Sequence, residues 1–111
     1  MIQVVKRDGE NAEFSLNKIT EAIKKAFKAT KKDYNNEILE LLSLRVTADF
    51  QDKMKEGMIS VEEIQDSVEH VLEQTGYTDV AKAYILYRKQ REKIRNMNST
   101  ILDYKDVVNS Y

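Results

Sequence analysis

The side chains in this sequence that are best suited to chemistry are cations at places where a phosphate could be held. They lie beside a turn signal, near the start of one predicted helix and near the end of another: Lys6, Arg7, Lys18 and Lys89. A lysine in the first turn of a helix opposes the helix dipole, whereas a phosphate there would satisfy both the lysine and the backbone N–H groups. Taken singly, Lys18 fits a surface lysine equally well, and Lys6 and Arg7 are better explained as solvated charges at a strand end.

The common alternatives for chemistry are missing from the sequence. It has three glycines and neither a GxxxxGK[ST] loop nor a GxGxxG fingerprint, so side-chain cations and turn backbone would have to hold a phosphate. There is no cysteine, and the one histidine, His70, has no partner at metal-ligand spacing. We therefore expect His70 to be a surface or half-buried helical residue. For Tyr84 and Tyr87, core packing is favoured over contact with a base.

Charge is distributed unevenly along the chain. The net charge of −1 argues against general nucleic-acid binding. Residues 1–32 and 82–95 are nevertheless basic and the stretch 62–73 is acidic, so a fold that joins the two basic ends would create one cationic pocket. No apolar run is long enough to span a membrane, no secretory signal is visible, and the absence of cysteine fits the cytoplasm, where we expect the protein to act.

The elements that position these cations begin with a predicted β-hairpin. Residues 2–14 fit two short strands around the turn signal Asp8-Gly9. Ser15 is a predicted N-cap, and an apolar stripe over 16–27 indicates the first helix. A polar loop is predicted over 30–36. The hairpin would thus lead directly into the helix that carries the first candidate lysine.

Two further helices follow the loop. The second is predicted over about 37–55, and Gly57 is expected to end it. Ser60 and Glu63 form an S-x-x-E capping box that marks the start of the third helix, and Ile59 is expected to act as a hydrophobic staple in front of it. The capping box is the clearest helix start in the sequence.

The fourth helix follows a glycine. Gly76 ends the third helix, Thr78 or Asp79 opens the fourth, and its pattern runs to about Arg95. Residues 96–111 have a weak pattern and are predicted to be a linker. The sequence therefore predicts a mainly α domain, a hairpin followed by four helices.

An ordered set of short motifs resembles the ATP-cone family at family-like spacings. The set comprises Val4-Val5-Lys6-Arg7-Asp8-Gly9, then Phe14, Lys18-Ile19, the segment from Ile59 to Glu69, and Ala83-Tyr84-Ile85-Leu86-Tyr87-Arg88. The resemblance implies an N-terminal β-hairpin lid over a four-helix bundle. The cone would occupy residues 1–95, and residues 96–111 would lead toward a catalytic domain outside this sequence.

The family implies an allosteric regulatory domain of ribonucleotide reductases, the enzymes of dNTP synthesis, activated by ATP and inhibited by dATP. The tail from Gln90 to Thr100 looks most like the anaerobic, glycyl-radical class, a ribonucleoside-triphosphate reductase. The chain itself would carry no catalytic residue and is not expected to be an enzyme. The implied partners are adenine nucleotides, the catalytic domain of the parent chain and a second cone, with no nucleic acid and no membrane.

The resemblance also assigns site residues. Positions that grip the triphosphate in cones match Lys6, Arg7, Lys18 and Lys89. Positions around the base match Val4, Val61, Gln65 and Ile85, of which Gln65 would read the adenine edge, and Ser15 would lie near the sugar. Some cones carry an acidic residue three places after the turn glycine, where this chain has Ala12. Mg²⁺ is implied with the triphosphate, and its protein ligand is unknown.

The resemblance implies a population shift, in which nucleotide orders the hairpin over the bundle and changes a quaternary contact. ATP and dATP differ by one hydroxyl, which is worth about 1 kcal/mol as a hydrogen bond, and allosteric couplings are typically about 1–3 kcal/mol. Two alternatives are a cone of another reductase class and a cone from a repressor of reductase genes, which would need an upstream zinc ribbon. A third is a ligand-free helical interaction module, in which Lys6, Lys18 and Lys89 are unrelated in space.

Overall fold

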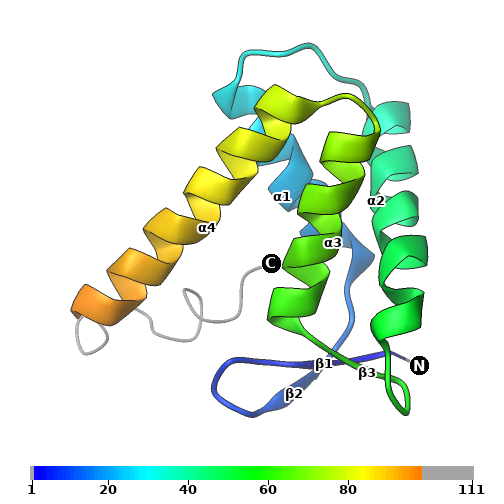
Figure 1. The fold of residues 1–111 in the computed structure, drawn as a ribbon, viewed down its shortest axis with the longest axis vertical. Helices are drawn as coiled ribbons and strands as arrows, with labels where there is room; N and C mark the ends of the chain where they lie inside the picture. Colours follow the sequence, from blue (N-terminus) through cyan, green and yellow to red (C-terminus); the bar gives the residue numbers. More distant parts are fainter. Residues whose placement is uncertain (1, 99–111) are drawn as a thin grey trace.

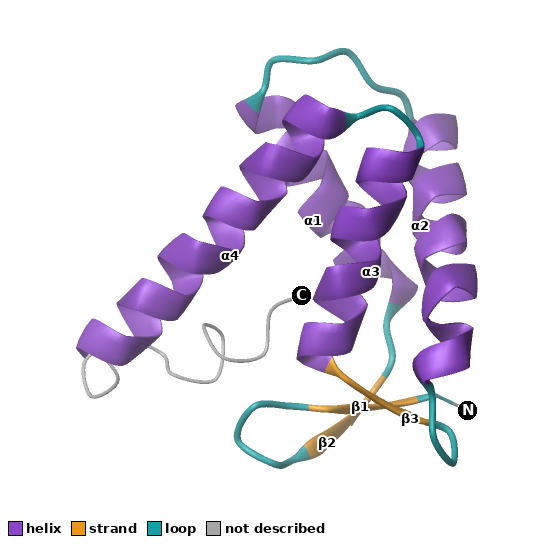
Figure 2. Cartoon of the chain, viewed as in Figure 1, coloured by secondary structure: helices purple, strands orange, loops and turns teal. Residues whose placement is uncertain are grey.

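Four helices make up most of the chain, and a small sheet lies at one end of them (Figures 1 and 2). The computed structural model describes residues 2–98, with side chains over residues 2–93. The elements in order are β1 (Gln3–Val5), β2 (Asn11–Glu13), α1 (Leu16–Ala29), α2 (Asn36–Phe50), the 3₁₀-helix η1 (Gln51–Lys53), β3 (Met58–Ser60), α3 (Val61–Gln74) and α4 (Thr78–Asn98). The mainly α fold with an N-terminal hairpin is confirmed.

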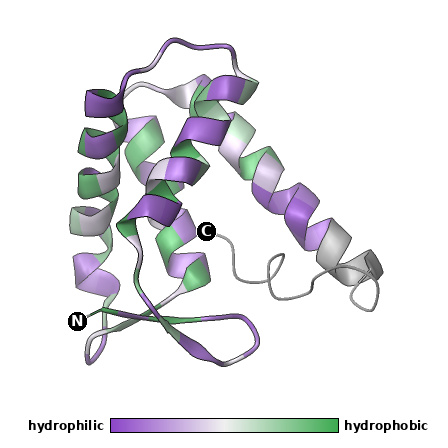
Figure 3. Cartoon of the chain, turned by 180° about the vertical axis from the view of Figure 1, so that it is seen from behind, coloured by the Kyte–Doolittle hydropathy of each residue, from purple (hydrophilic) through white to green (hydrophobic). Residues whose placement is uncertain are grey.

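The helices pack around one apolar core. α1 and α3 each contact both α2 and α4, so the four form a bundle. The stripe expected in the first helix faces this core, where Ile19, Ile23 and Phe27 are fully buried, and each such side chain contributes about 1.5–3 kcal/mol. Figure 3 shows hydrophobic and hydrophilic residues interspersed along the helices, as one buried face requires. Packing in this core therefore determines how α3 and α4 lie relative to each other.

The sheet has a third strand that the sequence did not predict. β3 pairs in parallel with β1, so the strand order is β2-β1-β3, and Val4 of β1 lies opposite Ile59. Ile59, which we expected to act as a staple, is a strand residue with 2% exposure. The predicted lid is thus a hairpin tied along its β1 edge to the residues that precede α3. β3 runs directly into α3, so the chain itself joins the sheet to that helix.

The second helix ends earlier than expected. The prediction of about 37–55 is wrong at its C-terminus. The α-helix α2 ends at Phe50, and the 3₁₀-helix η1 follows it directly. Gly57 does not cap it. Glu56 (φ 54°) and Gly57 (φ 76°) form a two-residue turn instead, with Lys55 and Met58 exchanging backbone hydrogen bonds of 2.9 and 3.0 Å. Pairing across this turn removes the chain from the helix.

The C-terminal part continues the fourth helix. α4 reaches Asn98, three residues beyond its predicted end. The remainder of the predicted linker, residues 99–111, lies outside the described residues. Within the described range, no helix is both long and apolar enough to cross a membrane.

Candidate functional site

The hairpin turn presents a basic residue to the helices. β1 ends at Val5, so Lys6 and Arg7 follow the strand and belong to the turn region. The amide of Gly9 (φ 88°) donates to the carbonyl of Lys6 over 2.9 Å, and the Lys6 amide donates to the carbonyl of Glu10 over 2.8 Å. This three-residue loop needs a left-handed residue at its end, which explains the glycine.

Arg7 bridges from this turn to α3. Its Nε donates to Oε1 of Glu62 over 2.7 Å, and its Nη2 donates to Oε1 of Gln65 over 2.9 Å. The Arg7 side chain is 16% exposed and that of Glu62 is 51% exposed. The capping box holds the start of α3 in register, since the Glu63 amide donates to Ser60 Oγ over 3.1 Å and the Ser60 amide donates to the Glu63 carboxylate over 3.2 Å. The predicted site residues Arg7 and Gln65 are therefore in direct contact.

A second arginine, on α4, also contacts α3. Nη1 of Arg88, on α4, donates to Oε1 of Glu69 over 2.8 Å and to Oδ1 of Asp66 over 3.1 Å. Burial alone would lower the pKa of Arg88, but the hydrogen bond and charge of Glu69 raise it above its ordinary value. In the sequence, Arg88 stands out only as the last residue of the motif from Ala83 to Arg88. The signal that was missed is the spacing of acids along α3.

Tyr84 places a buried hydroxyl among these charges. The residue has no exposed surface, so the core packing favoured from the sequence is confirmed, and its hydroxyl has no hydrogen-bond partner among the described residues. Burial raises the pKa of Tyr84, the charge of Arg88 and more weakly that of Arg7 oppose the rise, and the charge of Glu69 adds to it. Both guanidinium groups therefore lie within electrostatic range of this hydroxyl. An orphaned buried polar group of this kind calls for a ligand oxygen or a water.

The other predicted site residues divide into buried and exposed sets. Val4, Val61 and Gln65 have exposures of 1%, 0% and 4%. Ile85 is half-buried and Lys89 is exposed, and the two line a cavity of about 240 Å³ together with Glu69, Arg88 and Glu92.

The remaining three positions lie on the hairpin turn and around the start of α1. Lys6 is half-buried in the turn and Lys18 is exposed in the first turn of α1. Ser15 occupies the N-cap position predicted for it, but its side chain makes no capping hydrogen bond.

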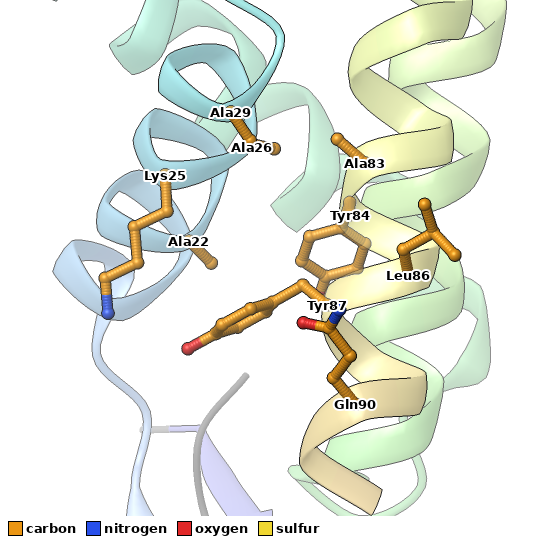
Figure 4. Close-up of a pocket in the computed structure, with 9 residues that line it drawn as sticks. All are labelled: Ala22, Lys25, Ala26, Ala29, Ala83, Tyr84, Leu86, Tyr87 and Gln90. Carbon is orange, nitrogen blue, oxygen red and sulfur yellow. The ribbon is translucent and has the colours of Figure 1, made fainter.

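A cavity of about 290 Å³ lies between α1 and α4 (Figure 4). Three alanines of α1 face it, and the rings of Tyr84 and Tyr87 line the opposite wall. Tyr87 is half-buried and its hydroxyl accepts a hydrogen bond from Arg91. None of the residues to which the resemblance assigns a nucleotide contact lines this cavity. Tyr84 alone contributes both to its wall and to the cluster around Arg7 and Arg88.

No metal centre is evident in the part of the chain that the structure describes. Within it, no group of three His, Asp or Glu side chains could hold an ion. His70 lies on the surface of α3, as expected, with 53% of its side chain exposed, and its Nδ1 lies 2.9 Å from Oδ1 of Asp49 on α2. The polar groups of the candidate site are the ion pairs of Arg7 and Arg88 and the buried hydroxyl of Tyr84.

The chain is similar to segments of several ribonucleotide reductases. A ribonucleoside-diphosphate reductase subunit alpha from Chlamydia pneumoniae is 42% identical over 102 residues, which cover 86% of this chain and 10% of the relative. A vitamin B12-dependent ribonucleoside-diphosphate reductase from Thermoplasma acidophilum is 47% identical over 98 residues, with 84% and 12% covered. An anaerobic ribonucleoside-triphosphate reductase from Haemophilus influenzae is 36% identical over 101 residues, with 88% and 14% covered.

The chain thus spans between about a tenth and a seventh of the length of these relatives. The model of the family described as the ATP cone domain matches residues 2–93, which include every element from β1 to most of α4. The chain belongs to the ATP-cone family.

Proposed function

We propose that this cone binds ATP and dATP between the hairpin turn, α3 and α4, and thereby regulates a ribonucleotide reductase. The names of the three relatives above support the reductase, and the match to the ATP cone domain family supports a regulatory role. These relatives include three kinds of reductase. We propose the anaerobic kind on the resemblance of the segment from Gln90 to Thr100 alone.

The observation that carries the proposal is the buried hydroxyl of Tyr84 within range of two arginines. A buried hydroxyl without a partner costs about 1–3 kcal/mol. A phosphate or sugar oxygen that reached it would recover this cost and would also meet Arg7 and Arg88. In a ligand-free interaction module the hydroxyl would instead have to be met by a buried water.

The triphosphate would be held by cations from three elements. Lys6 and Arg7 come from the hairpin turn, Lys18 from the first turn of α1 and Lys89 from α4. Guanidinium–phosphate bonds are short, charge-assisted and often bidentate. Mg²⁺ usually binds through substrate phosphates, waters and one or two carboxylates, and so it would enter as part of the nucleotide complex.

The base would contact the apolar residues beneath the hairpin. Val4 and Val61 are buried. A base would contact them only after the sheet has moved away from the bundle, and the sheet would then close over the bound base. Gln65 would then read the adenine edge, Ile85 would pack against the ring, and Ser15 would lie near the sugar. This requirement for opening links occupancy to the position of the hairpin, which is the population shift we propose.

The output would be a changed contact with the catalytic part of the parent chain or with a second cone. Leu41 and Leu44 support this, because each is 57% exposed and they lie three residues apart on one face of α2. A nucleotide that biases the hairpin by about 1–3 kcal/mol would suffice to shift such a contact.

Calorimetry and thermal melting with ATP and dATP, with and without Mg²⁺, test the proposal. At a ligand concentration about 100 times the Kd, binding stabilises a protein by about 2.7 kcal/mol, on the order of 10 °C for a domain of this size. Lys6→Ala should weaken ATP binding more than adenosine binding. No heat and no stabilisation at millimolar nucleotide would exclude the function, and equal losses for both ligands would exclude a phosphate role for Lys6.

A further inference from the structure

One face of α3 carries a row of carboxylates that we name the acidic stripe, made of Glu62, Asp66 and Glu69. The intervals of four and three residues place them on the same side of the helix. This stripe holds both arginines of the site, Arg7 through Glu62 and Arg88 through Asp66 and Glu69. The contacts join the hairpin and α4 to the same helix face.

These contacts occupy two of the five N–H groups of Arg7, on the Nε and Nη2 side, where an anionic ligand could bind in bidentate fashion. Nε of Arg7 lies 2.7 Å from a Glu62 oxygen and Nη2 lies 2.9 Å from the Gln65 oxygen. A guanidinium binds carboxylates and phosphates with the same fork of N–H groups. Arg7 therefore cannot keep its bond to Glu62 and give the same Nε–H to a phosphate.

We propose that the acidic stripe is an internal competitor for the triphosphate, and that Glu62 is the member that is exchanged. The inference rests on the proposed nucleotide site and assigns a residue that sets its affinity. When nucleotide binds, Arg7 leaves Glu62 for a phosphate oxygen, and Glu62 returns to water.

Exposure and the number of ion pairs together distinguish the pair of Arg7 with Glu62 from the two pairs of Arg88. The side chain of Glu62 is 51% exposed, so the carboxylate can be hydrated once Arg7 has left. Arg88 is bound to two carboxylates at once, Asp66 at 59% exposure and Glu69 at 21% exposure. Releasing Arg88 would therefore break two ion pairs and leave the less exposed Glu69 without a partner. Arg7 is the exchangeable arginine and Arg88 is the fixed one.

The exchange also changes Gln65. The carboxamide oxygen of Gln65 accepts from Arg7 in this structure, so movement of Arg7 alters the polar group that would read the base. Phosphate arrival and base reading would therefore be coupled through one side chain. Glu62, which lies three residues before Gln65 on α3, sets how readily a phosphate draws Arg7 away, and adenosine has no phosphate to do so.

Glu62→Gln tests the proposal, with Glu73→Gln as the matched control. Both substitutions remove one negative charge from the same face of α3, but Glu73 makes no ion pair among residues 2–93 and lies 11 positions further on, about 16 Å along the axis. That separation exceeds the Debye length of about 8 Å at physiological salt. We expect Glu62→Gln to tighten ATP binding about two- to fivefold and to leave adenosine binding unchanged.

Calorimetry with ATP and adenosine gives the decisive comparison. An unchanged Kd for ATP in Glu62→Gln, or an equal gain in Glu73→Gln, overturns the competitor role while wild-type binding keeps the nucleotide site. Absence of ATP binding by the wild type overturns both. As a second readout, the Nε–H resonance of Arg7 should shift in Glu62→Gln without nucleotide. Glu62→Asp, which shortens the reach by one methylene, should change affinity in the same direction.

Discussion

Arg7 and Gln65 are joined by a hydrogen bond of 2.9 Å between a hairpin turn and a helix that lie 58 residues apart in the sequence. The bond fixes the carboxamide of Gln65 with its oxygen toward the hairpin. It also means that the position of the turn and the orientation of a base-reading side chain cannot change independently. A ligand that draws Arg7 away would act on both at once.

Tyr84→Phe should separate the ligand role of the hydroxyl from its cost to folding. Removing a buried hydroxyl that has no partner eliminates a desolvation penalty of about 1–3 kcal/mol, so we expect the melting temperature of the free protein to be unchanged or higher. ATP binding should weaken if the hydroxyl meets a nucleotide oxygen. Calorimetry and melting on the same preparations give both values. A variant that is less stable yet binds ATP normally would assign Tyr84 to packing alone.

The four helices could be predicted because their signals are local. Apolar residues recur at helical spacing, and Ser60 with Glu63 forms its capping box within four residues. β3 could not be predicted in the same way. Its three residues gain their pairing from β1, which lies 55 residues away.

Candidate site residues could be named from the sequence by type, but their partners could not. Arg7 and Gln65 were assigned separate ligand roles from resemblance, and only the fold shows that they contact each other. Glu62 and Arg88 were visible as charges on helices. Their pairing depends on how α3 packs against the hairpin and α4, which no local pattern specifies. Electrostatic partners were therefore the missing information, and they define the exchange proposed for Glu62.

Ser60→Ala should destabilise the domain more than Ser15→Ala. Both serines occupy N-cap positions, but only Ser60 accepts a capping bond, from the Glu63 amide over 3.1 Å. Loss of such a cap costs about 1 kcal/mol, or roughly 4–8 °C in melting temperature for a domain of this size. Thermal melts of the two variants provide the comparison. Equal destabilisation would show that the capping box contributes no more than the position itself.

Asp49→Asn should reveal a pH-dependent link between α2 and α3. Burial alone would raise the pKa of Asp49, but hydrogen bonds from Ser67 and His70 and the charges of His70 and Lys53 lower it below its ordinary 3.8. A lowered folded-state pKa contributes stability that is present above about pH 3.8 and is lost as the pH falls through the folded value. The wild type should therefore melt above Asp49→Asn near pH 6, and the two curves should converge below pH 3.8.

Thermal melts between pH 2 and 7 measure this convergence. Asp52→Asn is the control, because Asp52 is exposed on η1 and takes part in no ion pair among residues 2–93. The melting temperature of Asp52→Asn should stay close to that of the wild type at every pH between 2 and 7. A difference for Asp49→Asn that is the same at pH 2 and pH 6 would mean that the ionised carboxylate adds nothing over a neutral amide. The pairing of α2 with α3 would then depend on the apolar core alone.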